Sequence, residues 1–295
     1  MNAQQAYELI DDVVTKLEQE GKQGEYIMGY VKALKSWFSH NNIQVMQKIK
    51  VPENDGPSKV AQEQVPVPEQ LKRILNACDQ KQKVESALVA FSGLRLESIG
   101  DYEGNDGLKV RDLPEMVVDN QSKTIGFEKI PTIVVVRKSL SKAGHQYISF
   151  MPQEGCDYIK ELLEYRMQNG ETLTADSAIV VSLRYLKGWL EGKYSDNNKA
   201  LHIDKSGHIR TSNIGDSIRA AIRKAGFDYR PYILRSYFET RMMMGEAEGL
   251  ILRDFRVFWM GHVGDIEHRY SLNKGRLSQD VIEKMRSSYE KAAER

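Results

Sequence analysis

A proline-rich stretch divides this chain of 295 residues into two helical parts of unequal length. The run VPENDGPSKVAQEQVPVPEQ holds four prolines and few apolar side chains, so it can add little to a hydrophobic core. We therefore interpret residues 51–66 as a linker between a small domain, residues 1–50, and a larger domain, residues 67–295.

The small domain is expected to be helical. Apolar side chains recur with the period of an amphipathic helix in residues 4–20, and a second helix is expected in YIMGYVKALKSWFSHN. The apolar side of that second helix is expected to comprise Tyr30, Val31, Leu34, Trp37 and Phe38. Lys32 and Lys35 lie off this stripe, in a segment, residues 26–50, that holds four lysines and no acidic residue. Both lysines are therefore available to phosphates, which clustered positive charge attracts.

The larger domain mixes helices with a short β-rich segment. Helical patterns begin at Pro68 and run through LKRILNACDQ and VESALVAFSG, and they resume at DYIKELLEYRMQNG and continue to the C-terminus with one polar interlude near residues 193–212. Between them, the runs TIGFEKI, PTIVVVRKSL and HQYISFM are rich in β-branched and aromatic residues and are separated by turn residues. The expected fold class is therefore mainly α with a small antiparallel β-sheet.

The composition is that of a cytoplasmic protein without a metal site. No stretch approaches the roughly 18 apolar residues of a membrane span, so a membrane is not expected as a partner. The two cysteines, Cys78 and Cys156, have neither metal-ligand spacing nor the pattern of a disulfide framework. We expect no cofactor and no metal ion.

The most specific pattern lies in the last third of the chain. The segments RPYILR, FWMGH and DIEHRY place Arg235, His262 and Tyr270 in this order. Far upstream, Arg95 lies in the apolar segment AFSGLRLESI, where a charge is unfavourable unless it has a partner. This order of residues resembles the tyrosine recombinase (phage-integrase) family, and within it the integrases of archaeal plasmids and viruses and the Xer-like recombinases.

The resemblance implies a role for each of these residues. Tyr270 would attack a phosphodiester, Arg95 and Arg235 would stabilise the charged phosphate, and His262 would donate a hydrogen bond to it. Tyr232 stands where most of the family has a histidine; a phenol can bond to a phosphate but is a poor base, with a pKa of about 10. Ser98 stands where the family usually has an acidic residue. His268 and Tyr289 are alternatives outside the Gly-His frame.

The family's general acid is a lysine on a β-hairpin, and two lysines compete for that position here. In VVVRKSLSKAGHQYISF, Lys138 ends the first strand and Lys142 lies in the turn. An ammonium there could protonate the departing 5′-oxygen, and we favour Lys138. Arg137 and Lys142 are expected to contact DNA.

The resemblance implies a site-specific recombinase that cuts and rejoins double-stranded DNA. The reaction would pass through a 3′-phosphotyrosine and a Holliday junction, carried out by a homotetramer on two sites in the nucleoid. The final helix would dock on a neighbouring subunit or fold back in cis, and residues 1–50 would be a truncated form of the family's core-binding domain. A type IB topoisomerase-like enzyme and a non-catalytic DNA-binding regulator are the alternatives.

Overall fold

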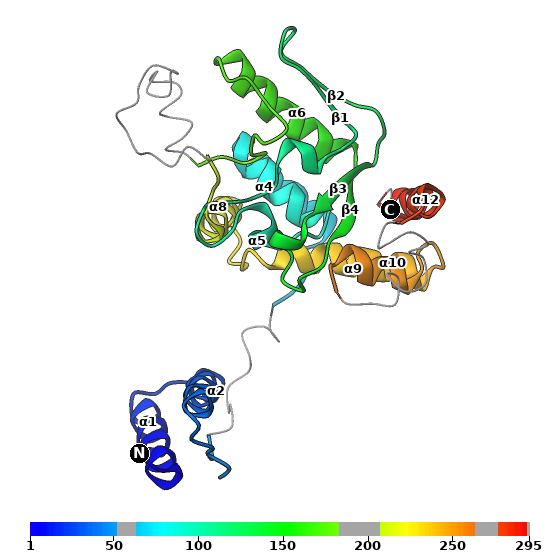
Figure 1. The fold of residues 1–295 in the computed structure, drawn as a ribbon. Coiled ribbons are helices and arrows are strands. Elements are labelled where there is room, and N and C mark those ends of the chain that lie inside the picture. The colour runs from blue at the N-terminus through cyan, green and yellow to red at the C-terminus, as the bar shows by residue number, and fades with distance from the viewer. Residues whose placement is uncertain (52–62, 183–206, 263–276, 294–295) are drawn as a thin grey trace. The chain divides into compact units, whose positions relative to one another are not determined.

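The structure, a computed structural model, describes residues 1–51, 63–182, 207–262 and 277–293 (Figure 1). The chain forms two compact units, Met1–Gln64 and Val65–Arg295. The boundary between them falls inside the segment that we interpreted as a linker. None of the described helices has the length and the apolar character that crossing a membrane requires.

The first unit is a pair of helices, α1 (Ala3–Gln19) and α2 (Gly24–His40). Asn2 caps α1, because its side chain accepts a hydrogen bond from the Gln5 backbone N–H. The core comprises Ala6, Ile10, Val14 and Leu17 of α1, Ile27, Val31 and Phe38 of α2, and Ile49.

The expected apolar stripe of α2 was wrong in two positions. Tyr30 and Trp37 are 44% and 59% exposed, whereas Ile27 is buried in their place. The reason is that α2 packs against one other helix, which covers only a narrow arc of its surface. The larger aromatic residues at the margin of that arc remain in contact with solvent.

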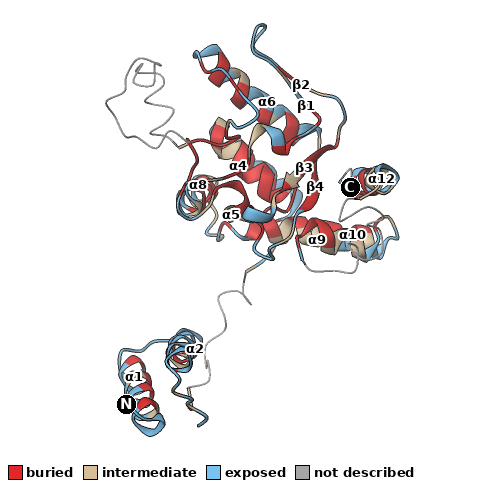
Figure 2. Cartoon of the chain, in the orientation of Figure 1, coloured by how far each residue is buried: buried red, intermediate tan, exposed pale blue. Residues whose placement is uncertain are grey.

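The second unit is mainly helical. Its α-helices are α3 (Pro68–Ala77), α4 (Gln80–Ala90), α5 (Leu96–Ile99), α6 (Gln153–Gln168), α8 (Thr211–Lys224), α9 (Ile233–Ala247), α10 (Arg253–Trp259) and α12 (Gln279–Ala293). Two short 3₁₀ helices, η1 (Val110–Asp112) and η2 (Lys138–Leu140), lie in the β-rich part. Helix α4 is the centre of the core: it packs against α6, α8 and α9 and is buried along most of its length (Figure 2).

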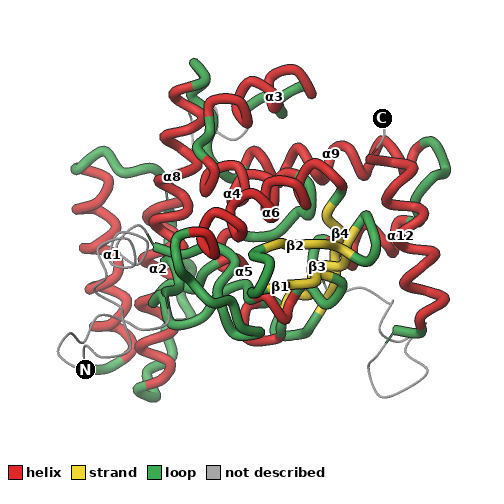
Figure 3. The backbone as a smooth tube through the Cα atoms, turned by 90° about the horizontal axis from the view of Figure 1, so that it is seen from above, coloured by secondary structure: helices red, strands yellow, loops and turns green. Residues whose placement is uncertain are grey.

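The β-rich segment forms two separate antiparallel pairs, which Figure 3 shows among the helices. Strand β1 (Met116–Asp119) pairs with β2 (Thr124–Phe127), and β3 (Thr132–Val136) pairs with β4 (Tyr147–Met151). We had expected β2 to share one sheet with the later strands and had not predicted β1. A local turn explains the difference, because the Asp119 carboxylate accepts hydrogen bonds from the next backbone N–H groups, at Gln121 and Ser122, and turns the chain back on itself.

Helix α12 packs in cis on its own unit, against α9. Arg286 forms an ion pair with the buried Glu115 at 2.5 Å, and the Tyr289 hydroxyl donates to the Phe91 carbonyl at 2.8 Å. Met285 lies fully within the core. Of the two arrangements that we expected for the final helix, the structure contains the one that folds back on the same chain.

Candidate active site

Three segments that are distant in the sequence meet at the carbonyl oxygen of Met260. Arg235, in the first turn of α9, donates from Nη2 to this oxygen at 2.6 Å and from Nη1 to the Gly93 carbonyl. Arg95, which caps the N-terminus of α5, donates from Nη1 to the same Met260 oxygen at 3.4 Å. The loop after α4, the start of α9 and the end of α10 therefore bring both arginines of the sequence pattern to one point.

Two glycines allow the chain to come this close. Gly93 has a φ of +64° and lies directly against the ring of Phe238, so that a side chain would collide with that ring. Gly261 has a φ of +61°, and a Cβ atom there would lie 2.5 Å from Cε1 of Tyr147. Glycine adopts this backbone conformation without strain and leaves room for the neighbouring ring. The glycine before His262 therefore has a packing function as well as a place in the motif.

The local electrostatics favour an anion. Arg235 is 1% exposed, and burial together with the charge of Arg95 lowers its pKa, although a guanidinium remains protonated at neutral pH. No carboxylate of the described part of the chain forms an ion pair with Arg95 or Arg235. Two neighbouring positive charges without a negative partner are unfavourable in a buried place unless a ligand supplies that partner.

His262 lies at the edge of this arginine pair. Its backbone N–H donates to the Val257 carbonyl at 3.1 Å, which attaches it to the end of α10. Burial, and then the charges of Arg235 and Arg95, lower the pKa of its imidazole. The ring is therefore neutral at neutral pH, and one of its nitrogens carries a proton that it can donate.

Tyr232 and the two hairpin lysines are exposed. Tyr232 is the N-cap residue of α9, one turn before Arg235, and is half exposed. Lys138 begins η2, just beyond β3, and Lys142 follows in the connection to β4. Ser98 fastens η2 to α5, because its hydroxyl donates to the Leu140 carbonyl at 3.0 Å. The segment that carries Lys138 is thus attached to the segment that carries Arg95.

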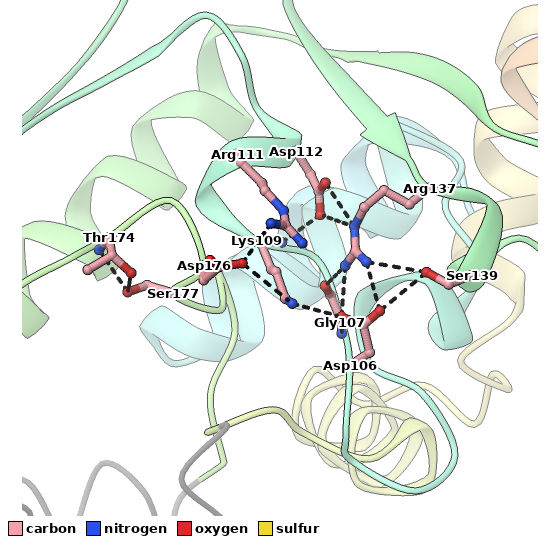
Figure 4. Close-up of polar contacts among 10 residues, drawn as sticks. All are labelled: Asp106, Gly107, Lys109, Arg111, Asp112, Arg137, Ser139, Thr174, Asp176 and Ser177. Carbon is pink, nitrogen blue, oxygen red and sulfur yellow. Dashed lines mark hydrogen bonds and ion pairs between the residues drawn. The ribbon is translucent and has the colours of Figure 1, made fainter.

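Arg137, which we expect to contact DNA, forms hydrogen bonds with two carboxylates of its own chain. Its Nε donates to Asp112 at 3.0 Å, Nη1 donates to Asp106 and Ser139, and Nη2 donates to Asp106 and the Gly107 carbonyl (Figure 4). All five N–H groups of a guanidinium are then occupied, so none remains for a phosphate. The sequence could not reveal this, because Asp106, in a loop, and Asp112, in η1, lie 31 and 25 residues upstream.

The other expected site residues lie elsewhere. Lys32 is exposed on α2 of the first unit, and Lys35 donates to the Gln47 carbonyl at 2.8 Å. Tyr270 and His268 lie outside the described residues. Tyr289, the alternative nucleophile, is 1% exposed, its hydroxyl is bonded to a carbonyl, and burial raises its pKa, so it is unsuited to attack DNA.

Sequence reasoning missed one residue of this site, Tyr147. It begins β4, is 1% exposed, and lies beside Arg235 and Arg95 with its ring beneath Gly261. In the sequence it is one more large residue of a buried strand, YISFM. The only signal was a polar hydroxyl in a strand that is otherwise apolar or carries a small serine.

No protein-family model and no curated protein sequence matches this chain. Solved structures are similar to it in fold. The structure of XerA recombinase is 18% identical and covers 94% of this chain and 80% of its own, with a TM-score of 0.44. The integrase from mycobacterium phage Brujita is 17% identical, and the match covers 93% of this chain and 83% of the integrase, with a TM-score of 0.40. The XerH site-specific recombinase bound to its difH substrate is 13% identical, and the match covers 99% of this chain and 69% of the recombinase, with a TM-score of 0.47.

Proposed function

We propose that this chain is a tyrosine-type site-specific DNA recombinase. Tyr270 attacks a phosphodiester of double-stranded DNA, which forms a 3′-phosphotyrosine and releases a 5′-hydroxyl. Attack by the 5′-hydroxyl of another strand breaks the phosphotyrosine bond and rejoins the backbone. The observation that carries the proposal is the meeting of Arg95 and Arg235 at the Met260 carbonyl, two residues before His262.

The arrangement suits phosphoryl transfer because it concentrates positive charge without a carboxylate partner among the residues described. Arg95 uses one Nη1 hydrogen for Met260 and keeps its other donors for phosphate oxygens. Arg235 uses one hydrogen of each Nη for a main-chain carbonyl, so it contributes its charge, its Nε–H and the remaining Nη hydrogens. His262, neutral and at the edge, donates a hydrogen bond to the phosphate, and Tyr232 adds a contact at the start of α9.

The leaving group needs a proton, and a hairpin lysine supplies it. In the proposal Lys138 protonates the departing 5′-oxygen, with Lys142 as the alternative, since both amino groups are exposed at the end of the β3–β4 pair. Lys32 and Lys35 of the first unit contact the DNA backbone. Four copies acting on two sites, through a Holliday junction, complete strand exchange in the nucleoid.

Covalent trapping tests the nucleophile. A nicked suicide duplex loses the short fragment that would otherwise be religated, so the wild-type protein should accumulate as a DNA adduct. Tyr270→Phe should bind the duplex and give no adduct, whereas the matched control Tyr289→Phe should still form one. An undiminished adduct from Tyr270→Phe would place the nucleophile elsewhere.

Strand exchange separates this function from its two alternatives. A duplex pair that carries two attachment sites should give recombinant products and junction intermediates. Relaxation of a supercoiled plasmid without recombinants would instead indicate a topoisomerase-like enzyme. Binding without any adduct would indicate a non-catalytic regulator.

A further inference from the structure

Two buried hydrogen-bond donors at the arginine pair have no acceptor in the described structure. The hydroxyl of Tyr147 is buried and makes no hydrogen bond there, and neither does Nε of Arg235. Both residues are about 1% exposed, so neither group can be satisfied by bulk water. Buried polar groups in native proteins almost always have partners, and an unpartnered one calls for an explanation.

The two donors lie side by side. The positive charges of Arg235 and Arg95 both act on the Tyr147 phenol, and Ser98 lies near it. The Ser98 hydroxyl donates to the Leu140 carbonyl at 3.0 Å, and it makes no hydrogen bond with the phenol in the described structure. The Tyr147 ring is held from one side by the Gly261 backbone. The phenol therefore lies close to the Arg235 side chain and within the field of both guanidinium groups.

The chemistry of this place points to an oxyanion. Burial raises the pKa of Tyr147, so the phenol keeps its proton at neutral pH and acts as a donor. The groups around the phenol that need a partner are therefore an O–H, an N–H and two positive charges. A negatively charged oxygen that accepts from both donors would satisfy all of them, and a tetrahedral phosphate presents such oxygens.

We propose that the Tyr147 hydroxyl and the Arg235 Nε–H together bind one non-bridging oxygen of the phosphate on which the enzyme acts. The proposal rests on the proposed function and adds to it a catalytic residue on β4 that the sequence pattern does not contain. It also assigns a direction of approach, since the Nη atoms of Arg235 are turned to the carbonyls of Gly93 and Met260.

Inorganic phosphate, titrated into the full-length chain, tests the anion site without requiring DNA cleavage. Tyrosines labelled with ¹³C at Cζ report it by NMR, and the signal that disappears in Tyr147→Phe identifies residue 147. We expect that signal to shift with phosphate in the wild type. Tyr147→Phe should weaken phosphate binding, followed by calorimetry, roughly ten- to hundredfold, as expected for one hydrogen bond to a charged group.

Tyr289→Phe is the matched control, since its hydroxyl is equally buried but bonded to the Phe91 carbonyl. It should lower the melting temperature and leave phosphate binding unchanged. Tyr147→Phe should show the opposite pattern, because it removes a hydroxyl that makes no hydrogen bond among the described residues. The proposal would be overturned if phosphate did not shift the Tyr147 signal, or if Tyr147→Phe bound phosphate with the affinity of the wild type.

Cleavage of the suicide duplex then distinguishes this proposal from the proposed function. We expect Tyr147→Phe to cleave roughly ten- to hundredfold more slowly than wild type at saturating DNA, with unchanged DNA affinity. If phosphate binding depends on Tyr147 but the wild type never forms an adduct, the anion site holds and the recombinase function fails. If the wild type cleaves and Tyr147→Phe cleaves equally fast, the recombinase function holds and the role of Tyr147 fails.

Discussion

At the residue scale, the two arginines differ in how much the fold depends on them. Arg235 satisfies two main-chain carbonyls from a buried position, whereas Arg95 is partly exposed and shares one of those carbonyls. In the proposed function, both present a positive charge to the phosphate. Stability and cleavage should therefore respond differently to their removal.

We predict that Arg95→Ala and Arg235→Ala each slow cleavage by about 10³–10⁵, the range known for an arginine that stabilises a transferring phosphoryl group. Only Arg235→Ala should also lower the free energy of unfolding, by about 3 kcal/mol, because it removes the donor to the Gly93 carbonyl and leaves the Met260 carbonyl with the longer bond from Arg95 alone. Arg95→Ala should lower it by less than about 1 kcal/mol. Single-turnover cleavage and urea unfolding measure the two effects. A variant that cleaves within about tenfold of wild type would remove that arginine from the site.

The general acid can be identified by changing the leaving group. A 5′-bridging phosphorothiolate replaces the departing oxygen with sulfur, whose thiolate leaves without a proton. Lys138→Ala should cleave ordinary DNA about 10²–10⁴-fold more slowly and recover nearly the full rate on the sulfur substrate. Arg95→Ala should not recover, since its loss affects the phosphate. Rescue of Lys142→Ala instead would move the acid to the turn, and rescue of neither would place it outside the hairpin.

The sequence predicted part of this site for a physical reason. A charged residue in an apolar segment and a histidine directly after a glycine can both be recognised in the sequence alone. Arg95 and His262 could therefore be identified as candidates. Arg137 and Tyr147 could not be assigned in this way. The role of Arg137 depends on Asp106 and Asp112, and that of Tyr147 depends on the Arg235 guanidinium. These partners lie far away in the sequence.

At the scale of elements, Arg137 joins the loop before η1 to the end of β3. Its partner Asp112 is nearly buried, with a side chain that is 3% exposed, and Asp106 accepts two of its hydrogen bonds. The neighbouring Arg111 forms a comparable ion pair with Asp176, but both of those side chains are largely exposed. The two arginines therefore form a natural comparison between a buried and a surface ion pair.

Arg137→Ala should lower the free energy of unfolding by about 3 kcal/mol, because it leaves the Asp112 carboxylate buried without its charged partner. Arg111→Ala should change it by less than about 1 kcal/mol. Urea unfolding of both variants measures the difference. If Arg137→Ala were as stable as wild type but bound DNA more weakly, the original assignment of Arg137 to DNA would be restored.

The same network should make the protein sensitive to acid. Burial alone would raise the pKa of Asp106, but hydrogen bonds from Arg137 and from the Gly107 N–H outweigh it and lower that pKa below its ordinary value. The unfolded chain therefore takes up this proton first as the pH falls. The stabilisation is complete above about pH 4 and is lost progressively below it. Asp106→Asn should lack this contribution at pH 7 and lose less stability than wild type between about pH 4 and pH 2.

Helices and strands were predicted well where apolar residues recur with a regular period within one segment. They were predicted less well where contacts with other segments determine the structure. The helices follow from their apolar periodicity, and the β3–β4 pair follows from its continuous apolar runs. The division of the strands into two pairs depends on the Asp119 turn, and the exposure of Tyr30 and Trp37 depends on the number of helices that pack on α2. Neither can be read from the period of a single segment.

At the scale of the whole molecule, the two units have separate cores. One hydrophobic cluster contains buried residues from Ala6 to Ile49, and the other contains buried residues from Leu71 to Ala292. Among the described residues, neither core contains a side chain from the other unit. The stability of the larger unit should therefore not depend on the smaller one.

A fragment that comprises residues 65–295 tests this independence. It should melt at the temperature of the larger unit in the full chain, because it keeps every described side chain of its own core. Its affinity for DNA should be lower, and its binding should depend less steeply on salt, since the lysines of residues 26–50 no longer release counterions from the DNA. In the full chain, Lys32→Ala should lower that salt slope by about 1. Melting of the fragment at a much lower temperature would show that the units share a core, and an unchanged salt slope would remove the first unit from the DNA interface.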